Sequence, residues 1–178
     1  MRRVVFIALT IVVVLGAAGA SWAEEAGGTK PIQIALFSPV QIVPEEMSIL
    51  GLRLNLLYGV NRNMTGLDLG LVNRTTGHTT GLQHGVVGMT GGNFTGWQDN
   101  FVNMVDGRML GFQSGFYNGA KDGKGFLLGA VNVTHSMNGL QLGFFNMTDT
   151  LYGLQVGILN IVRDKEKLPV LPIVNWSF

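Results

Sequence analysis

The sequence repeats one short phrase at nearly constant spacing, and this repeat limits the folds open to the chain more than any other feature. The eight-residue phrase GLQLGFFN, which starts at residue 139, returns fourteen residues later as GLQVGILN. Related phrases start at seven places, separated first by 15 residues and then by 14. Self-similarity at a fixed period indicates a repeat architecture, in which each unit packs against its neighbours. The units are GLDLGLVN (66–73), GLQHGVVG (81–88), GWQDNFVN (96–103), GFQSGFYN (111–118), GFLLGAVN (125–132), GLQLGFFN (139–146) and GLQVGILN (153–160).

Within each unit, side chains alternate with the period of a β-strand. In the last unit, Leu154, Val156 and Ile158 share one face of the expected strand, while glycine and glutamine occupy the other. Polar segments with Asp-Gly pairs, such as 105–108 and 121–124, separate the units and favour tight turns between antiparallel strands. Repeated glycines allow such strands to approach closely and to bend. The residues that define the repeat are Gly66, Gly70, Asn73, Gly81, Gly85, Gly111, Gly115, Asn118, Gly139, Gly143, Asn146, Gly153, Gly157 and Asn160.

The strand pattern continues beyond the seven units, in segments 31–42, 49–59 and 168–178. The sequence therefore predicts an all-β fold of about ten strands. We favour a shallow up-and-down antiparallel barrel built from 14–15-residue strand-turn repeats, because closure removes the exposed edges of a sheet. A β-solenoid with one coil per repeat is the alternative, since a solenoid gives identical repeats identical surroundings.

Residues 1–23 have the features of a secretory signal peptide, with Arg2 and Arg3 before an apolar stretch and a small-x-small site at 21–23. Residues 24–178 are then expected to form a single repeat-built domain. Cysteine is absent, which excludes disulfides, a thiol nucleophile and cysteine-ligated metals. Without Arg2 and Arg3 the chain carries ten basic and eleven acidic residues, so nucleic acid is not an expected partner.

The C-terminal alternation of Val174, Trp176 and Phe178 is typical of the last strand of bacterial outer-membrane barrels. We therefore predict an exported protein at the bacterial outer membrane or cell surface, with a periplasmic or secreted location as the alternative. Neither strand face is purely apolar, because glutamines occupy one and polar residues interrupt the other. A shallow barrel lying on or partly in the membrane is expected, with the outer membrane or lipid as its partner.

His84, Asp99 and Ser114 stand at the fourth position of three consecutive units, and their residue types are those of a hydrolase triad. A triad needs histidine between the other two, whereas the order of the units places Asp99 in the middle. We therefore predict a polar seam and no catalytic residues. His78 and His135 have no partner at metal-ligand spacing, so no metal or cofactor is expected. The glutamines are expected to hydrogen-bond along one sheet face, and the unit-ending asparagines to be turn residues.

The phrases GLRLNLLYG (51–59), GLDLGLVN, the GLQxGxxN series and the closing PIVNWSF resemble the bacterial surface-repeat family of leptospiral type. The resemblance covers residues 32–178 and implies an exported, cell-surface protein. The repeats are also similar to those of β-flower-type shallow barrels, which implies a likeness to lipid-binding tubby-type domains. The chain departs from the repeat at Gly88, Asn100 and Leu127.

Three functions follow as hypotheses from these features. The first is a non-enzymatic, outer-membrane-associated surface-repeat protein with a structural or interaction role, contacting lipid through exposed Leu and Phe side chains and Trp97. The second is a barrel that binds a lipid or another small apolar ligand. The third, which the order of the polar seam disfavours, is an outer-membrane lipid hydrolase.

Overall fold

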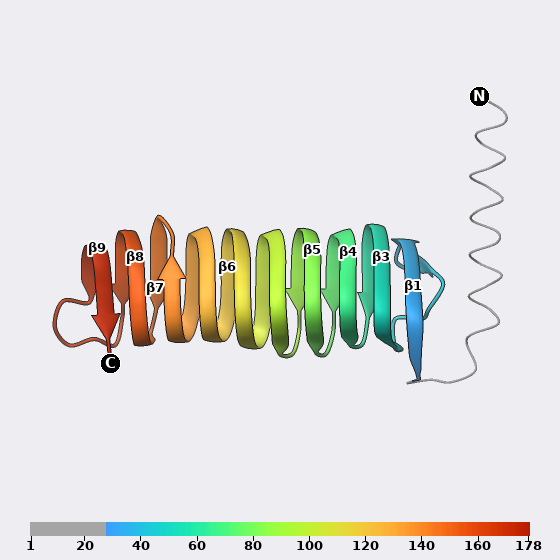
Figure 1. Ribbon diagram of the computed structural model, residues 1–178, viewed down its shortest axis with the longest axis horizontal. Coiled ribbons are helices and arrows are strands. Elements are labelled where there is room, and N and C mark those ends of the chain that lie inside the picture. Colours follow the sequence, from blue (N-terminus) through green and yellow to red (C-terminus); the bar gives the residue numbers. More distant parts are fainter. Residues whose placement is uncertain (1–27) are drawn as a thin grey trace, which may run out of the picture.

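The chain forms a β-solenoid in which successive coils stack along one long axis (Figure 1). The computed structural model describes residues 28–178. Its strands follow one another along the stack in the order of the sequence, apart from β2, which lies beyond β1. The strands are β1 (Thr29–Phe37), β2 (Val40–Gln41), β3 (Ser48–Asn61), β4 (Met64–Thr75), β5 (Thr79–Thr90), β6 (Phe94–Leu142), β7 (Phe145–Thr148), β8 (Thr150–Val162) and β9 (Val170–Ser177).

The all-β class and the 14–15-residue repeat are confirmed, and of the two architectures left open by the sequence the chain adopts the solenoid. The antiparallel up-and-down barrel favoured above is not formed. Equivalent positions pair in parallel and in register, so that Gly66 pairs with Gly81 and Gly81 with Gly96. The Asp-Gly pairs at 106–107 and 122–123 make no hairpins, because β6 runs through both while it winds around the coil.

Two positions of the unit carry glycine for different reasons, the opening position in all seven units and the fifth position in all but the unit that contains Asn100. The opening glycine has a positive φ in every coil, such as 130° at Gly111, where an added Cβ would lie 2.1 Å from the carbonyl oxygen of Gly96. The fifth-position glycine faces the interior, and a Cβ on Gly115 would lie 2.0 Å from the carbonyl oxygen of Asn100. The repeated glycines therefore let one coil stack directly on the next.

The interior of the solenoid is filled largely by amide side chains. Asn118 donates to the Oδ1 of Asn132 at 2.8 Å and to the carbonyl oxygen of Leu128 at 3.0 Å. Asn132 and Asn146 continue this ladder toward the C-terminus, and all three asparagines are fully buried. The expectation that these asparagines are turn residues is therefore wrong. In-register stacking places each amide next to a copy of itself, which satisfies its donors and acceptors inside the fold.

A second ladder runs through the third position of the unit. Gln113 donates to Gln98 at 2.7 Å, and Gln98 donates to Gln83 at 2.8 Å. The glutamines therefore form the hydrogen bonds that we expected along one sheet face. Toward the N-terminus the ladder ends in a fully buried ion pair, in which Arg53 binds both carboxylate oxygens of Asp68 at 2.7 and 2.6 Å. The two ladders thus occupy one interior position of the unit each, the eighth for asparagine and the third for glutamine.

The three departures from the repeat fit the interior. Gly88 lacks the unit's asparagine, and the amide of Asn100 occupies that space, since a Cβ on Gly88 would lie 2.4 Å from its Nδ2. Asn100 donates to the Oδ1 of Asn103 at 2.7 Å and so rejoins the asparagine ladder. Leu127 interrupts the glutamine ladder and joins an interior apolar cluster with Phe94, Val105, Met109, Ala120, Met137, Leu151 and Val162.

Different structures cover the two ends of the stack. At the N-terminal end, β2 pairs antiparallel with β1, and Val43, Met47, Ile49 and Met64 form a second apolar cluster. At the C-terminal end, β9 pairs antiparallel with β8, and Lys165 donates to the carbonyl oxygen of Trp176 at 2.8 Å. The C-terminal alternation that we interpreted as an outer-membrane barrel signal therefore belongs to a strand that covers the last coil.

Candidate functional site

Four outward positions of each coil, numbered from the opening glycine, form rows along the solenoid. Positions 3 and 8 carry the buried ladders, whereas the side chains at positions 2, 4, 6 and 7 are half-buried or exposed and point away from the interior. We call these rows 2, 4, 6 and 7, and together they form the apolar face. Row 2 is Leu67, Leu82, Trp97, Phe112, Phe126, Leu140 and Leu154; row 4 is Leu69, His84, Asp99, Ser114, Leu128, Leu142 and Val156; row 6 is Leu71, Val86, Phe101, Phe116, Ala130, Phe144 and Ile158; row 7 is Val72, Val87, Val102, Tyr117, Val131, Phe145 and Leu159.

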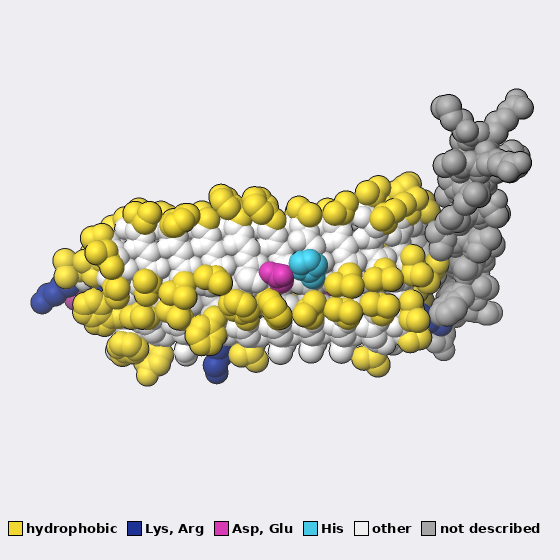
Figure 2. Space-filling model, turned by 45° about the horizontal axis from the view of Figure 1, so that its top comes forward, with side chains coloured by type: hydrophobic (Ala, Val, Ile, Leu, Met, Phe, Trp, Pro, Cys, Tyr) yellow, Lys and Arg dark blue, Asp and Glu magenta, His cyan; other side chains and the backbone are white. Residues whose placement is uncertain are grey.

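The apolar face consists almost wholly of apolar and aromatic side chains. Seven coils with four such positions give 28 side chains, of which 25 are apolar or aromatic. Phe116 is 52% exposed, Phe144 67% and Ile158 70%. Figure 2 shows hydrophobic side chains running in bands along the length of the solenoid, interrupted near the middle by a histidine beside an acidic side chain. An apolar surface this extensive marks an interaction site.

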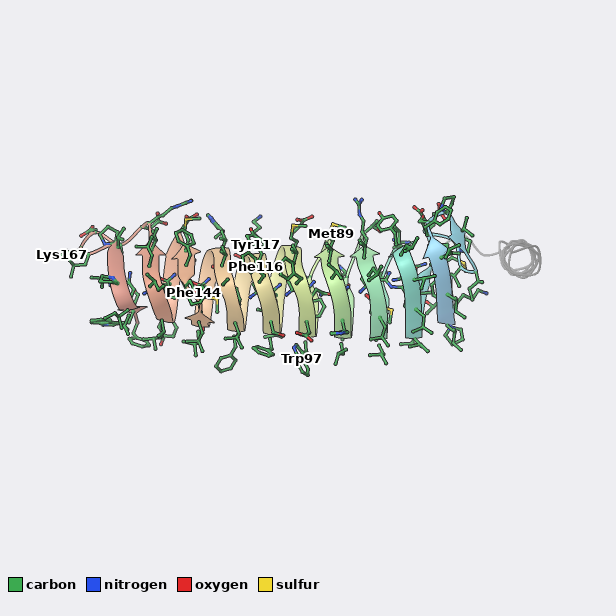
Figure 3. The ribbon with its side chains drawn as sticks, turned by 90° about the horizontal axis from the view of Figure 1, so that it is seen from above. Met89, Trp97, Phe116, Tyr117, Phe144 and Lys167 are labelled. Carbon is green, nitrogen blue, oxygen red and sulfur yellow. The ribbon has the colours of Figure 1, made fainter. Side chains whose placement is uncertain are left out.

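Aromatic rings on the apolar face pack against each other between coils. The rings of Phe101 and Phe116 are stacked, with their centroids 5.1 Å apart and their planes at 12°. Trp97 lies 5.9 Å from the ring of Phe112. Seen from above, Trp97 projects at one edge of the molecule, Phe116 lies on the upper face and Tyr117 lies at the opposite edge (Figure 3). The apolar face therefore wraps around the coil from row 2 to row 7.

Charged side chains gather in the segments between units, outside the apolar face. Asp106, Arg108 and Lys121 are exposed there. In the same region, Asp149 accepts from Arg163 at 3.0 Å and lies 2.5 Å from the Nδ1 of His135. The solenoid is therefore amphipathic around its circumference, because its charged side chains lie away from the apolar face.

A groove with a volume of ≈ 810 Å³ runs along the apolar face between rows 4 and 6, near the C-terminal end. Fifth-position glycines line its floor between the two rows. Ala130 is the smallest residue of row 6 and widens the groove beside Phe144. The walls are Leu128, Leu142 and Val156 on one side and Ala130, Phe144 and Ile158 on the other, with Ser114 and Ile173 also lining the groove.

The structure brings His84, Asp99 and Ser114 together in a line across three coils. The Nδ1 of His84 lies 2.9 Å from one oxygen of Asp99, and the hydroxyl of Ser114 donates to the other oxygen at 2.5 Å. Trp97 donates from Nε1 to the same hydroxyl at 3.0 Å. Asp99 separates the histidine from the serine, so the imidazole has no contact through which to accept the serine's proton. This geometry gives no support to the hydrolase hypothesis.

The repeat-defining residues predicted from the sequence form contacts between neighbouring coils. The repeat-defining glycines and asparagines belong to the coil contacts and ladders, and the sequence reasoning missed that the glutamine face is the inside of the coil. Within residues 28–178 no group of three or more His, Asp or Glu side chains could hold a metal ion. Among the same residues, no helix has the length and apolar character needed to cross a membrane.

Comparison of the chain with protein-family models, with curated proteins and with solved structures finds no match. The resemblance to surface-repeat proteins therefore stays a prediction based on the repeat phrase.

Proposed function

We propose that the protein is an exported, non-enzymatic scaffold that attaches to a lipid surface through its apolar face. The observation that carries this proposal is the reversal of polarity between the inside and the outside of the coil. Glutamine and asparagine fill the interior, while 25 of the 28 outward side chains of the four rows are apolar or aromatic. Water around such a face is unfavourable, whereas an apolar environment stabilises it.

The chemistry of the apolar face suits the boundary between lipid head groups and acyl chains. A Phe or Leu side chain contributes roughly 1.5–3 kcal/mol when it is fully buried. Interfacial proteins insert about 5–10 Å into this boundary, which is enough for outward side chains to enter. Trp97, Phe101 and Phe116 supply aromatic rings, and Trp97 also has a polar N–H. The charged side chains of the reverse side would stay in water.

The cellular location is part of the same proposal. The features of residues 1–23, which lie outside the described residues, support export. The likeness of the repeat phrase to surface-repeat proteins supports the outer membrane or the cell surface. A periplasmic or secreted location is the alternative, and a lipid surface is accessible from each of these compartments.

The proposal is tested by sedimentation of residues 24–178 with phosphatidylcholine vesicles at low and high salt. We expect the wild-type protein to sediment with the vesicles at both salt concentrations, because the attachment is apolar. Replacing the stacked pair, Phe101→Ser with Phe116→Ser, is expected to weaken binding at least tenfold. The matched control is Met104→Ser with Leu110→Ser, which removes two exposed apolar side chains that lie outside the four rows and is expected to retain binding.

Two results would overturn the proposal. One is a wild-type protein that stays in solution at both salt concentrations. The other is a dimer in analytical ultracentrifugation that dissociates in the Phe101/Phe116 variant and ignores vesicles, since a second copy would then cover the apolar face. Circular dichroism of each variant checks that the strands are retained.

A further inference from the structure

The groove between rows 4 and 6 offers an occupant apolar contact and almost no hydrogen bonds. The backbone around its floor is already paired: Gly143 donates to the carbonyl oxygen of Val156 at 3.0 Å, and Phe144 donates to that of Ala130 at 3.0 Å. In addition, the carbonyl oxygen of Leu142 accepts from the buried amide of Asn132 at 2.9 Å. A peptide laid in the groove would bring N–H and C=O groups that find no partner there, which is costly. A hydrocarbon chain brings none.

The length of the groove fits one extended acyl chain. Its walls come from four consecutive coils, from Ser114 in the first to Val156 and Ile158 in the last. Adjacent coils are spaced like paired strands, so this length is about 14 Å. An extended chain of about a dozen carbons has a similar length, given carbon–carbon bonds of about 1.5 Å. Ile173 of β9 lines the same groove at its C-terminal end.

The opposite end of the groove is polar. Ser114 lines the groove there, and its hydroxyl leads through Asp99 to His84 along row 4. The side chain of Asp99 is 36% exposed and that of His84 is 62% exposed, so both can contact a ligand. Trp97 stands two residues before Asp99 on the same outward side of the strand. A carboxylate beside an aromatic ring suits a cationic group and disfavours an anion.

We propose that the groove holds one acyl chain of about a dozen carbons, whose cationic or zwitterionic head group lies at Asp99 beside Trp97. This inference refines the proposed function, because the apolar face would take up a single lipid molecule as well as lie on a lipid surface. The head group is then recognised by the polar residues of row 4, which are His84, Asp99 and Ser114. This role does not require the geometry of a catalytic triad. The small side chain of Ala130 leaves room for the acyl chain to enter the groove.

The first experiment measures calorimetric binding of dodecyltrimethylammonium to residues 24–178, below the concentration at which this amphiphile forms micelles. We expect one site per protein in the wild type and at least tenfold weaker binding in Ala130→Phe. The matched control, Val86→Phe, makes the same kind of change in row 6 but outside the groove, and is expected to bind within twofold of the wild type. Equal weakening in both variants, or many weak sites, would overturn the inference.

The second experiment tests the head group with laurate, which has a chain of the same length and an anionic carboxylate. We expect the wild type to prefer dodecyltrimethylammonium, and Asp99→Asn to lose that preference while still binding the chain. Tighter binding of laurate by the wild type would overturn the assignment of the head group to Asp99.

Vesicle sedimentation of the same variants separates this inference from the proposed function. Ala130→Phe is expected to sediment with vesicles like the wild type, since the rest of the apolar face is intact. Phe101→Ser with Phe116→Ser is expected to bind the amphiphile, because neither side chain lines the groove. Loss of both activities in both variants would contradict the assignment of two separate sites.

Discussion

The interior of the solenoid is largely polar and its outward face is apolar, which is the reverse of the arrangement in most proteins. Asn146 is fully buried and donates to Asn160 at 2.8 Å, whereas Phe144, two residues earlier, is 67% exposed. A buried amide is therefore stable when the next coil offers the same amide in register as its hydrogen-bond partner. The stability of the stack therefore depends on the ladders and interior clusters, and the outward rows are free to serve binding.

The buried ion pair gives the sharpest contrast with the outside. Asp68→Ala leaves the guanidinium of Arg53 buried without its carboxylate, and both side chains are 0% exposed. We expect the free energy of unfolding to fall by about 3–5 kcal/mol. Urea denaturation measures this loss, with a lower midpoint at an unchanged slope.

The control for the ion pair is Asp99→Ala, which removes the same carboxylate from row 4 on the outside. Its loss is expected to be about 1 kcal/mol or less, because water can replace the hydrogen bonds of a partly exposed group. Equal midpoints for the two variants would show that the interior and the outward rows contribute alike to stability.

Exchanging the residues at positions 88 and 100 tests whether the interior space beside Gly88 holds only one amide. Asn100→Gly is expected to cost about 1–3 kcal/mol, because it leaves buried polar groups of Gln83 and Asn103 with fewer partners. Gly88→Asn alone places a second amide where that of Asn100 already lies. The double variant restores the repeat phrase in both units.

The double-mutant cycle for this pair measures the coupling in urea denaturation. We expect the double variant to be more stable than the sum of the single changes, by about 0.5–3 kcal/mol. Strict additivity would mean that the two departures from the repeat do not compensate each other.

The smallest effect is expected for an outward aromatic side chain. Phe144→Ser should change the free energy of unfolding by no more than about 0.5 kcal/mol in the absence of lipid, since the ring is largely in water. Asn146→Ser, the interior neighbour, should cost about 1–3 kcal/mol through its lost ladder contacts. A larger loss for Phe144→Ser than for Asn146→Ser in thermal and urea denaturation would contradict the division between inside and outside.

The sequence predicted the β class and the repeat length, because alternation and glycine spacing are local signals. It did not distinguish the solenoid from the barrel, since strands of either fold alternate with the same period. The pair Asp106-Gly107 was also misleading, because it fits a hairpin turn but lies within β6. A stronger signal was present in the recurrence of asparagine at one position, which parallel stacking in register can satisfy.

The candidate site was only partly predictable. The order of His84, Asp99 and Ser114 followed from their places in consecutive units, because stacking makes such residues neighbours. The glutamines were assigned to a sheet face of unknown orientation, and polarity alone gave no reason to place them inside. The groove depends on Ala130 standing in a row of larger side chains, and its significance appears only when rows 4 and 6 are known to flank the glycines.

The strand β9 covers the edge of the parallel stack that β8 would otherwise expose. Stacks of parallel strands with asparagine and glutamine ladders are also the geometry of amyloid fibrils, which grow by adding further identical layers. Here the last layer runs antiparallel to β8 and contains Pro172, with Pro169 just before it, and proline cannot donate a backbone hydrogen bond to an incoming strand. By pairing antiparallel with β8, β9 covers an edge that would otherwise act as a template for polymerisation.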